Sequence, residues 1–321
     1  MTGPAGPSAL LCTDTILARY GDRLCAAAPE LEPVGLVGAD AVGDDDLRRL
    51  RVAFFSGDAW PDRAAHFMGA VARAPDLRWL HTFSAGTDHP VFTGLLERGV
   101  RVSSSSGAAA GPIARTVLMY LLALSRDLPR LVRAQAAHEW SPQRFDDLAG
   151  KLIGVVGMGP IGCEVIRLAS ACGMRPIGMR RRVIGDEPCA TWPLDRLGEL
   201  ASAVDVLAIA LPLTDDTRGI VSADIVSRLR PDATFVNVGR GELVDEPALT
   251  DALVAGRIGA AALDVFATEP LPADSPLWDL PNVIITPHSS GITLATEERA
   301  AEIFLTNLAA FARGDPLLNE R

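Results

Sequence analysis

A glycine-rich turn near the middle of the chain constrains the fold more than any other feature. Five residues with apolar or small side chains, 152–156, lead into Gly157, Gly159 and Gly162, and a helical pattern continues to Cys172. A short run of this kind is typical of a buried parallel strand. The strand, the Gly-x-Gly-x-x-Gly turn and the helix together predict the βα unit that opens a dinucleotide-binding Rossmann domain.

Each glycine of the turn has a physical reason to be there. Gly157 permits the tight turn, Gly159 has no side chain to obstruct a pyrophosphate, and Gly162 lets the helix lie close to the sheet. We expect Pro160 and Ile161 to contact the cofactor as well, because the start of a helix offers unpaired N–H groups and a partial positive charge. A glycine-rich loop without a ligand is the alternative, but the strand before it and the helix after it favour binding.

Three arginines follow about twenty residues after the turn, where an acid normally accepts the ribose 2′-hydroxyl of NAD. They are Arg180, Arg181 and Arg182. A carboxylate there would repel a 2′-phosphate, whereas guanidinium groups bind phosphate, often with two hydrogen bonds. A solvated basic turn is the alternative. The position and the sign of the charge favour NADP, with Arg180 and Arg181 as its ligands, and NAD remains an option.

Short apolar runs alternate with helical patterns along the whole chain, which predicts doubly wound parallel α/β architecture. The predicted strands are 9–12, 34–37, 52–55, 79–83, 152–156, 176–179, 206–210, 234–238, 260–263 and 283–285. The predicted helices are 160–172, 222–229, 246–255 and 293–314, with a long bridging helix over 112–137. Because the glycine turn begins only at Gly157, the residues before it need a domain of their own. We expect one domain from 1–104 with 291–321, and a dinucleotide-binding domain from 105–290.

Composition narrows the class of protein. Apolar residues make up 48% of the 321 residues, which is enough for a real core, and the net charge of −10 argues against binding nucleic acid. The N-terminus has no pattern of a secretory signal, and we expect no membrane span. The cysteines show no metal-ligand spacing, so we predict no metal and a reducing, cytoplasmic setting. They are Cys12, Cys25, Cys163, Cys172 and Cys189.

Several motifs occur in an order that is far more specific than any one of them. They lie at 151–162, 211–214 (Leu-Pro-Leu-Thr), 236–245 (Val-Asn-Val-Gly-Arg-Gly-Glu-Leu-Val-Asp), 263–270 (Leu-Asp-Val-Phe-Ala-Thr-Glu-Pro) and 286–288 (Thr-Pro-His). The set resembles the D-isomer-specific 2-hydroxyacid dehydrogenase family, and within it the NADPH-dependent glyoxylate/hydroxypyruvate reductase-like branch. The resemblance covers nearly the whole chain and is strong over 148–319. It implies a flavodoxin-like substrate domain and a Rossmann domain, with the active site in the cleft between them.

The resemblance implies a catalytic set of Arg240, Glu269 and His288. Arg240 would bind the carboxylate of a 2-oxo acid and polarise its ketone, and His288 would protonate the ketone oxygen as hydride arrives at the carbon. Glu269 would orient the imidazole and favour its protonated form. Taken singly, Arg240 could be an ordinary turn residue, Glu269 a polar loop residue and His288 a structural histidine.

The resemblance also marks a loop at 84–89, where the backbone N–H groups of Ala85 and Gly86 would hold the substrate carboxylate. The alternative is a strand-to-helix turn that needs Gly86 for its shape. Ser56 and Trp60 are candidates for the pocket wall. Trp140 matches a tryptophan that can approach the partner subunit's site, although a core position is an equally good interpretation.

Further cofactor contacts are implied by the same motifs, in loops that follow the later strands. They are Leu211, Pro212, Thr217, Val238, Gly239, Asp264, His288 and Ser290. A homodimer built on the helix from Pro112 is implied as well. One departure concerns that helix, which usually begins Ala-Glu and here begins Ala114-Arg115.

The sequence therefore predicts an NADP-dependent reductase of small 2-oxo acids. A formate dehydrogenase-like enzyme is a weaker alternative, because that branch carries Gln where Glu269 stands. The other alternative is a corepressor-like module that senses dinucleotides, since such proteins keep the same three residues. The NADP-type turn and the lack of long terminal tails count against it.

Overall fold

The computed structural model describes residues 6–38 and 40–321. The chain divides into two compact units, Met1–Ala108 with Thr293–Arg321, and Ala109–Ile292. The boundaries expected from the sequence lie a few residues away from these. Whether residues 1–104 with 291–321 and residues 105–290 fold as independent domains stays a prediction.

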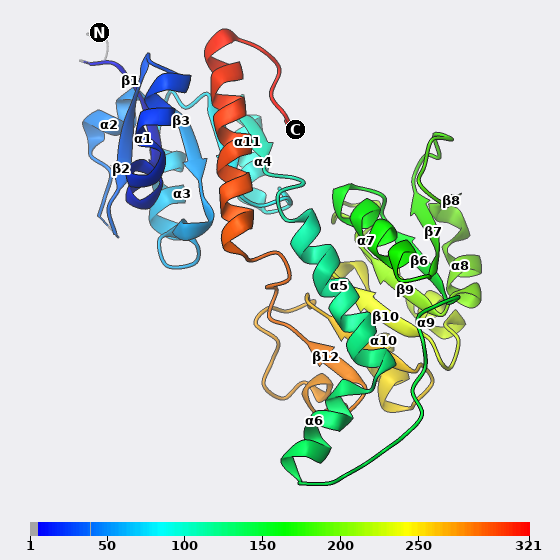
Figure 1. Ribbon diagram of the computed structural model, residues 1–321. Helices are drawn as coiled ribbons and strands as arrows, with labels where there is room; N and C mark the ends of the chain where they lie inside the picture. The colour runs from blue at the N-terminus through cyan, green and yellow to red at the C-terminus, as the bar shows by residue number, and fades with distance from the viewer. Residues whose placement is uncertain (1–5, 39) are drawn as a thin grey trace. The chain divides into compact units, whose positions relative to one another are not determined.

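The first unit is built on a parallel sheet in which, among the described residues, five strands run in the order β2-β1-β3-β4-β5. Figure 1 labels β1, β2 and β3 of this sheet. This 2-1-3-4-5 order is that of flavodoxin-like folds. The strands are β1 (Ser8–Thr13), β2 (Leu31–Leu36), β3 (Leu50–Phe55), β4 (Trp79–Thr82) and β5 (Arg101–Ser104).

Helices cover this sheet, and the last helix of the chain returns to it. They are α1 (Asp14–Ala27), α2 (Asp44–Arg49), α3 (Ala64–Arg73), α4 (Pro90–Glu97) and α11 (Leu294–Arg313). The Thr293 hydroxyl accepts from Thr296 N–H and begins α11, and Gly314 ends it with a φ of 76°. Phe304 of α11 stacks on Phe54 of β3 with ring centroids 4.2 Å apart. The predicted helix over 293–314 is confirmed.

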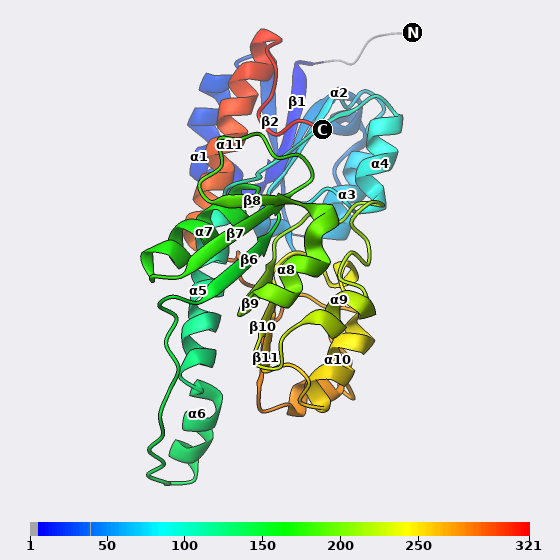
Figure 2. The ribbon, with the colours of Figure 1, turned by 90° about the vertical axis from the view of Figure 1, so that its right-hand side faces the viewer.

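In the second unit, the described strands form a seven-stranded parallel sheet in the order β12-β11-β10-β9-β6-β7-β8 (Figure 2). Counted from β6, this is the Rossmann order with one more strand, and the winding reverses between β6 and β9. The predicted class of two doubly wound parallel sheets is confirmed. The strands are β6 (Leu152–Val156), β7 (Arg175–Arg180), β8 (Ala190–Pro193), β9 (Val206–Ile209), β10 (Thr234–Asn237), β11 (Ala260–Leu263) and β12 (Val283–Ile285).

The helices of this unit differ from expectation at the bridging helix, and the helix at 197–203 has no counterpart among the predicted ones. They are α5 (Ala110–Ser125), α6 (Leu128–Ala136), α7 (Pro160–Ala171), α8 (Leu197–Ala203), α9 (Ala223–Arg228) and α10 (Glu246–Val254). The single helix predicted over 112–137 is wrong, because α5 and α6 are separate helices. Asp127 between them has a φ of 47°, and Pro129 in the first turn of α6 cannot continue a helix begun before it.

The apolar-run criterion missed two strands, β5 and β8. Strand β5 is rich in serine. The buried Ser103 hydroxyl is hydrogen-bonded, because it accepts from Trp79 Nε1 at 2.8 Å. Strand β8 is a short edge strand that ends in Pro193. No helix among the described residues is long and apolar enough to cross a membrane.

Candidate active site

The predicted site residues of the second unit gather at one edge of its sheet. The glycine turn follows β6 and Arg180 ends β7, while Arg240, Glu269 and His288 follow the neighbouring strands β10, β11 and β12. In a parallel sheet the carboxyl ends of all strands meet at the same edge. Ligands of doubly wound folds bind there, beside the point where the winding reverses.

Steric constraints explain the three glycines of the turn. Gly157 has a φ of 108°, and a Cβ added there would lie 2.7 Å from the Ala210 carbonyl oxygen. A Cβ on Gly162 would lie 1.8 Å from the Gly157 carbonyl oxygen, whereas one on Gly159 would meet no described heavy atom within 4 Å. Among the described residues no side chain caps α7, so its first N–H groups remain for a ligand. The turn fits a pyrophosphate at the start of α7.

The arginine turn after β7 brings two acids with it. Arg180 Nη1 lies 3.6 Å from Glu187 Oε1, and Arg181 Nη2 lies 2.7 Å from Asp216 Oδ2. Arg182 is exposed. No pattern in the sequence marks Glu187 or Asp216 as a partner of these arginines. An anion that binds the guanidinium groups has to share them with Glu187 and Asp216 or displace these carboxylates.

Glu187 is fixed by the backbone of its own loop. Its carboxylate accepts hydrogen bonds from Ile184 N–H at 2.7 Å and from Gly185 N–H at 2.8 Å. The Ile184 bond, then the Gly185 bond and the charge of Arg180, hold the pKa of Glu187 below its ordinary value. Glu187 is therefore a fixed negative charge beside Arg180.

The loop after β9 carries three predicted cofactor residues. Leu211 is buried and Pro212 is exposed. The Thr217 hydroxyl donates to the Pro212 carbonyl at 2.8 Å and accepts from Thr214 N–H at 2.8 Å. Since the Thr217 side chain is buried and its hydroxyl folds the loop, its contact with a cofactor stays a prediction.

The turn that presents Arg240 is held by its own backbone. The Asn237 side-chain oxygen accepts from Gly239 N–H at 3.0 Å, and its amide donates to the Arg240 carbonyl at 2.9 Å. A Cβ on Gly241 would lie 1.9 Å from the Phe266 carbonyl carbon, so this turn packs backbone to backbone against the segment that carries Glu269. Arg240 Nη1 donates to the Gly239 carbonyl at 2.8 Å. Val238, another predicted contact, is buried at the start of this turn.

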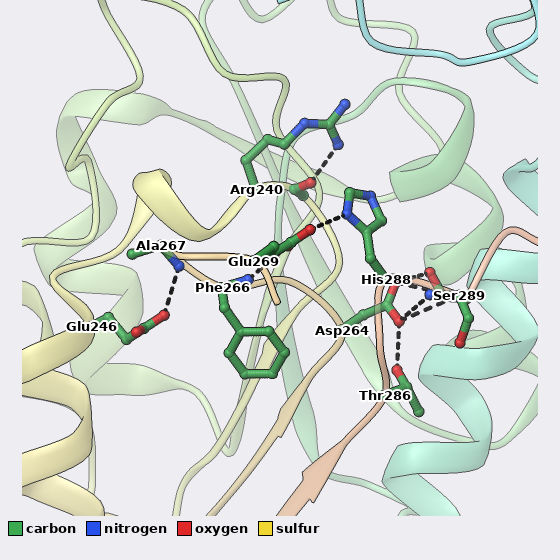
Figure 3. A network of polar contacts seen from close by, with 11 residues as sticks. Arg240, Glu246, Asp264, Phe266, Ala267, Glu269, Thr286, His288 and Ser289 are labelled. Carbon is green, nitrogen blue, oxygen red and sulfur yellow. Dashed lines mark hydrogen bonds and ion pairs between the residues drawn. The ribbon is translucent and has the colours of Figure 1, made fainter. Parts of the chain in front are cut away.

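The structure brings His288 and Glu269 into direct contact. His288 Nδ1 lies 2.8 Å from Glu269 Oε2, and Glu269 Oε1 accepts from Phe266 N–H at 3.0 Å. Figure 3 shows the Arg240 side chain beside this pair. The His288 side chain is 47% exposed and that of Glu269 36%. Because an ionised carboxylate only accepts, Nδ1 carries a hydrogen and Nε2 is left for chemistry.

The loop around His288 is anchored by Asp264, which is buried. His288 has a φ of 52°, a left-handed conformation that costs energy for a residue with a side chain. Its N–H donates to the Asp264 carbonyl at 2.8 Å. The Asp264 carboxylate accepts from Ser289 N–H at 3.0 Å, Ser290 N–H at 3.2 Å and the Ser290 hydroxyl. Asp264 and Ser290 were expected to bind a cofactor; in this structure they shape the loop, and their contact with a cofactor stays a prediction.

Sequence reasoning missed several residues that support the site. Asn237 was detectable, because an asparagine before Gly-x-Gly commonly bonds the backbone of a turn. Glu246 accepts from Ala267 N–H at 2.8 Å, and no motif pointed to that contact. Thr286 belongs to the Thr-Pro-His motif, but its hydrogen bond to Asp264, at 2.5 Å, left no signal. Their partners are distant in sequence, so only folding brings them together.

The first unit carries the remaining candidates. Ala85 is exposed in the loop after β4, and the Gly86 carbonyl accepts from the Ser84 hydroxyl at 2.7 Å. Ser56 is buried and donates to Asp58 Oδ1 at 2.5 Å, whereas Trp60 is 62% exposed. Binding of substrate by these residues stays a prediction.

Two residues linked to the predicted dimer belong to the second unit. Trp140 is 95% exposed, so its interpretation as a core tryptophan is wrong. The charge of Arg115 on α5 helps to lower the pKa of Glu164 on α7, after the larger effect of the Arg167 hydrogen bond and that residue's charge.

All five cysteines lie among the described residues and are free thiols. The described residues hold no His/Cys/Asp/Glu cluster suited to a metal.

Comparisons with known proteins give consistent matches. A family model described as D-isomer specific 2-hydroxyacid dehydrogenase, NAD binding domain, matches residues 118–290. Glyoxylate/hydroxypyruvate reductase B of Pectobacterium atrosepticum is 38% identical over 252 residues, which cover 76% of this chain and 78% of the relative.

Solved structures agree over almost the entire chain. An NADPH-dependent glyoxylate/hydroxypyruvate reductase from Sinorhizobium meliloti, in complex with NADP and sulfate, matches with a TM-score of 0.80 at 28% identity, covering 98% of each chain. A D-isomer specific 2-hydroxyacid dehydrogenase family protein from Aeromonas salmonicida matches with a TM-score of 0.83 at 29% identity, covering 98% of this chain and 99% of the other. The family-model match includes the glycine turn, Arg240, Glu269 and His288.

Proposed function

Because this chain belongs to the D-isomer specific 2-hydroxyacid dehydrogenase family, and is thus an oxidoreductase, we propose that it reduces small 2-oxo acids with NADPH. Glyoxylate and hydroxypyruvate are the first substrates to test, since relatives are named for them. The observation that carries the proposal is the 2.8 Å contact between His288 and Glu269 with Arg240 beside it (Figure 3). It joins a proton donor, the acid that orients it and a binder of anions.

The three side chains divide the chemistry of a carbonyl reduction. Arg240 binds the substrate carboxylate and draws electron density toward the ketone oxygen with its fixed set of donors. When bound, the reduced nicotinamide supplies the hydride to the carbonyl carbon. His288 Nε2 gives its proton to the ketone oxygen, which becomes the 2-hydroxyl group. Glu269 holds Nδ1 and stabilises the positive imidazolium before that transfer.

The cofactor is assigned from the glycine and arginine turns. Pyrophosphate would lie on the uncapped start of α7, over the open space at Gly159. Arg180 and Arg181 would bind the 2′-phosphate of NADP, and the reductase from Sinorhizobium meliloti is a complex with NADP. In the first unit, we assign the backbone N–H groups of Ala85 and Gly86 to the substrate carboxylate.

A homodimer belongs to the same proposal. Leu128 and Val132 of α6 and Trp140 beyond it are exposed apolar side chains, which a second copy of the chain would cover. Light scattering of the purified protein tests this, and a monomer at micromolar concentration would contradict it. The free thiols are compatible with a cytoplasmic setting.

The decisive experiment measures the loss of NADPH absorbance with glyoxylate, hydroxypyruvate and a panel of larger 2-oxo acids. We expect turnover with at least one small oxo acid, and a rate lower by about a hundredfold or more with the His288→Asn variant. Tight NADPH binding without turnover of any oxo acid would contradict the proposal. That result would support the dinucleotide-sensing binding module instead.

The cofactor assignment has its own test. Replacing Arg180 by Asp and Arg181 by Ala should lower kcat/KM for NADPH by roughly a hundredfold, since two charge-assisted contacts are lost. The value for NADH should change far less. Arg182→Ala is the matched control. An unchanged ratio of the two kcat/KM values would show that the arginines do not select the cofactor.

A further inference from the structure

Tyr120 lies deep inside the second unit, yet its hydroxyl connects to the loop that carries His288. The residue is on α5, and its side chain is fully buried in the core beside the sheet. Its Oη is hydrogen-bonded to the Thr286 hydroxyl, which donates to Asp264 Oδ1 at 2.5 Å. Three side chains from α5, the end of β12 and the end of β11 therefore form one continuous chain of hydrogen bonds.

The direction of these hydrogen bonds follows from the available protons. The single proton of the Thr286 hydroxyl is used toward Asp264, so this hydroxyl accepts from Tyr120. Burial raises the pKa of Tyr120 to about 12, so the phenol keeps its proton at neutral pH. Tyr120 donates to Thr286, and Thr286 donates to Asp264.

Asp264 connects these hydrogen bonds to the backbone that carries the imidazole. Its carboxylate takes the N–H groups of Ser289 and Ser290, and its carbonyl takes the N–H of His288. His288 holds a φ of 52°, which persists only where the surrounding structure enforces it. A second contact from α5 acts on the same segment, because the Thr116 hydroxyl donates to the Ser290 carbonyl at 3.3 Å.

We propose that Tyr120 is a positioning residue for His288, acting through Thr286 and Asp264 to hold the 286–290 segment in the conformation that presents the imidazole to Glu269. The inference rests on the proposed function, because turnover is one of its readouts. Because the Tyr120 side chain is fully buried, we expect it to act on the reaction only through the orientation of the imidazole ring.

The test compares the two tyrosines of the chain. Tyr120→Phe removes one oxygen from the hydrogen-bond chain, and Tyr20→Phe removes the same atom from α1 in the first unit. Loss of one hydrogen bond predicts that Tyr120→Phe lowers kcat by roughly threefold to tenfold. KM for the oxo acid should stay within about twofold, because substrate binding is not altered. Tyr20→Phe should leave kcat unchanged.

A second readout does not depend on catalysis. The ring signals of the five histidines can be followed by NMR, with that of His288 assigned by its absence in His288→Asn. Tyr120→Phe should move the His288 signals and Tyr20→Phe should not. If no oxo acid is turned over, the proposed function fails, but these spectra still decide whether Tyr120 positions the ring.

Variants of Thr286 separate the hydrogen-bond chain from simple packing. Thr286→Val should lower kcat and move the His288 signals at least as much as Tyr120→Phe, whereas Thr286→Ser should keep most of the turnover. Adding Tyr120→Phe to Thr286→Val should not lower kcat further, because Thr286→Val has already interrupted the series of hydrogen bonds. Should Tyr120→Phe fail to fold, the Val and Ser variants make the same comparison. An additive double variant, or a Tyr120→Phe protein that matches Tyr20→Phe in both readouts, overturns the proposal.

Discussion

Two histidines of this chain, His81 in the first unit and His288 in the second, both have hydrogen-bonded rings but opposite surroundings. His81 is fully buried in β4, with Nδ1 2.7 Å from the Ser103 hydroxyl and Nε2 2.9 Å from the Ser105 hydroxyl. Both ring nitrogens are used, and burial lowers the pKa of His81 to about 3. His288 is half exposed and bonded to a carboxylate through one nitrogen.

The difference shows that hydrogen bonding alone does not decide whether a histidine ring is buried and neutral or open to solvent. Neutral hydroxyl partners and burial keep His81 uncharged, so it stabilises the sheet. The His288 ring instead has a carboxylate partner at Nδ1 and is half exposed, which is the arrangement that the proposed proton transfer needs. Variants of each histidine, or of its hydrogen-bond partners, test this comparison.

The largest effect is expected at the exposed ring. His288→Asn should lower kcat by about a hundredfold or more, because general acid catalysis contributes that much. NADPH affinity, measured by fluorescence titration, should change little. Weaker cofactor binding with kcat intact would reverse the role given to His288.

Removing the acid partner should have the next largest effect. Glu269→Gln keeps a hydrogen-bond acceptor but loses the charge that stabilises the imidazolium, so kcat should fall by roughly tenfold or more. The matched control is Glu246→Gln, which alters the other carboxylate that holds this segment, at Ala267 N–H. Equal losses in the two variants would mean that Glu269 only supports the loop.

The buried ring should be sensitive to its hydroxyl partners. Ser103→Ala leaves His81 Nδ1 and Trp79 Nε1 without the oxygen that both contact. Unsatisfied buried groups cost about 1–3 kcal/mol each, and denaturant unfolding should show a loss of that size. A loss below about 0.5 kcal/mol would mean that the hydroxyl contributes little.

The smallest effect concerns pH. The folded chain holds the pKa of His81 at about 3, below its ordinary value of 6.5, so between these values the unfolded chain binds a proton that the folded chain does not. Stability contributed by the neutral ring is present above pH 6.5 and is lost on acidification, by about 1.4 kcal/mol per pH unit. Urea unfolding of the wild type and of His81→Gln gives the difference between their free energies of unfolding, which should therefore become smaller from pH 7 to pH 5. A difference that does not change with pH would contradict the lowered pKa of His81.

Much of the site was predictable because its chemistry is local. The spacing of its glycines identifies the glycine turn in the sequence. The structure shows why side chains are excluded there, since a Cβ at Gly157 or Gly162 would clash with backbone atoms. Arg240, Glu269 and His288 were found through ordered motifs, and the contact of His288 with Glu269 agrees with the predicted pair. The NADP assignment rested on Arg180 and Arg181, but the acids beside them were not foreseen.

The missed features share one cause, because each depends on a contact between residues that are far apart in the sequence. Tyr120 and Thr286 are 166 residues apart, and Asp264 is 22 residues from Thr286. His81 meets Ser103 and Ser105 only because β4 and β5 lie side by side. The break between α5 and α6 was local and could have been predicted from Pro129.

The sequence by itself determined the architecture and the kind of chemistry, because strand periodicity, glycine spacing and the types of reactive side chain are properties of short segments. The tertiary structure alone decided which polar groups became buried partners and which stayed accessible. Burial and distant contacts decide the surroundings of each side chain, so two histidines with the same ring lie in opposite surroundings. The same folding joined Tyr120 to Thr286, two residues before His288, and no pattern in the sequence marks that contact.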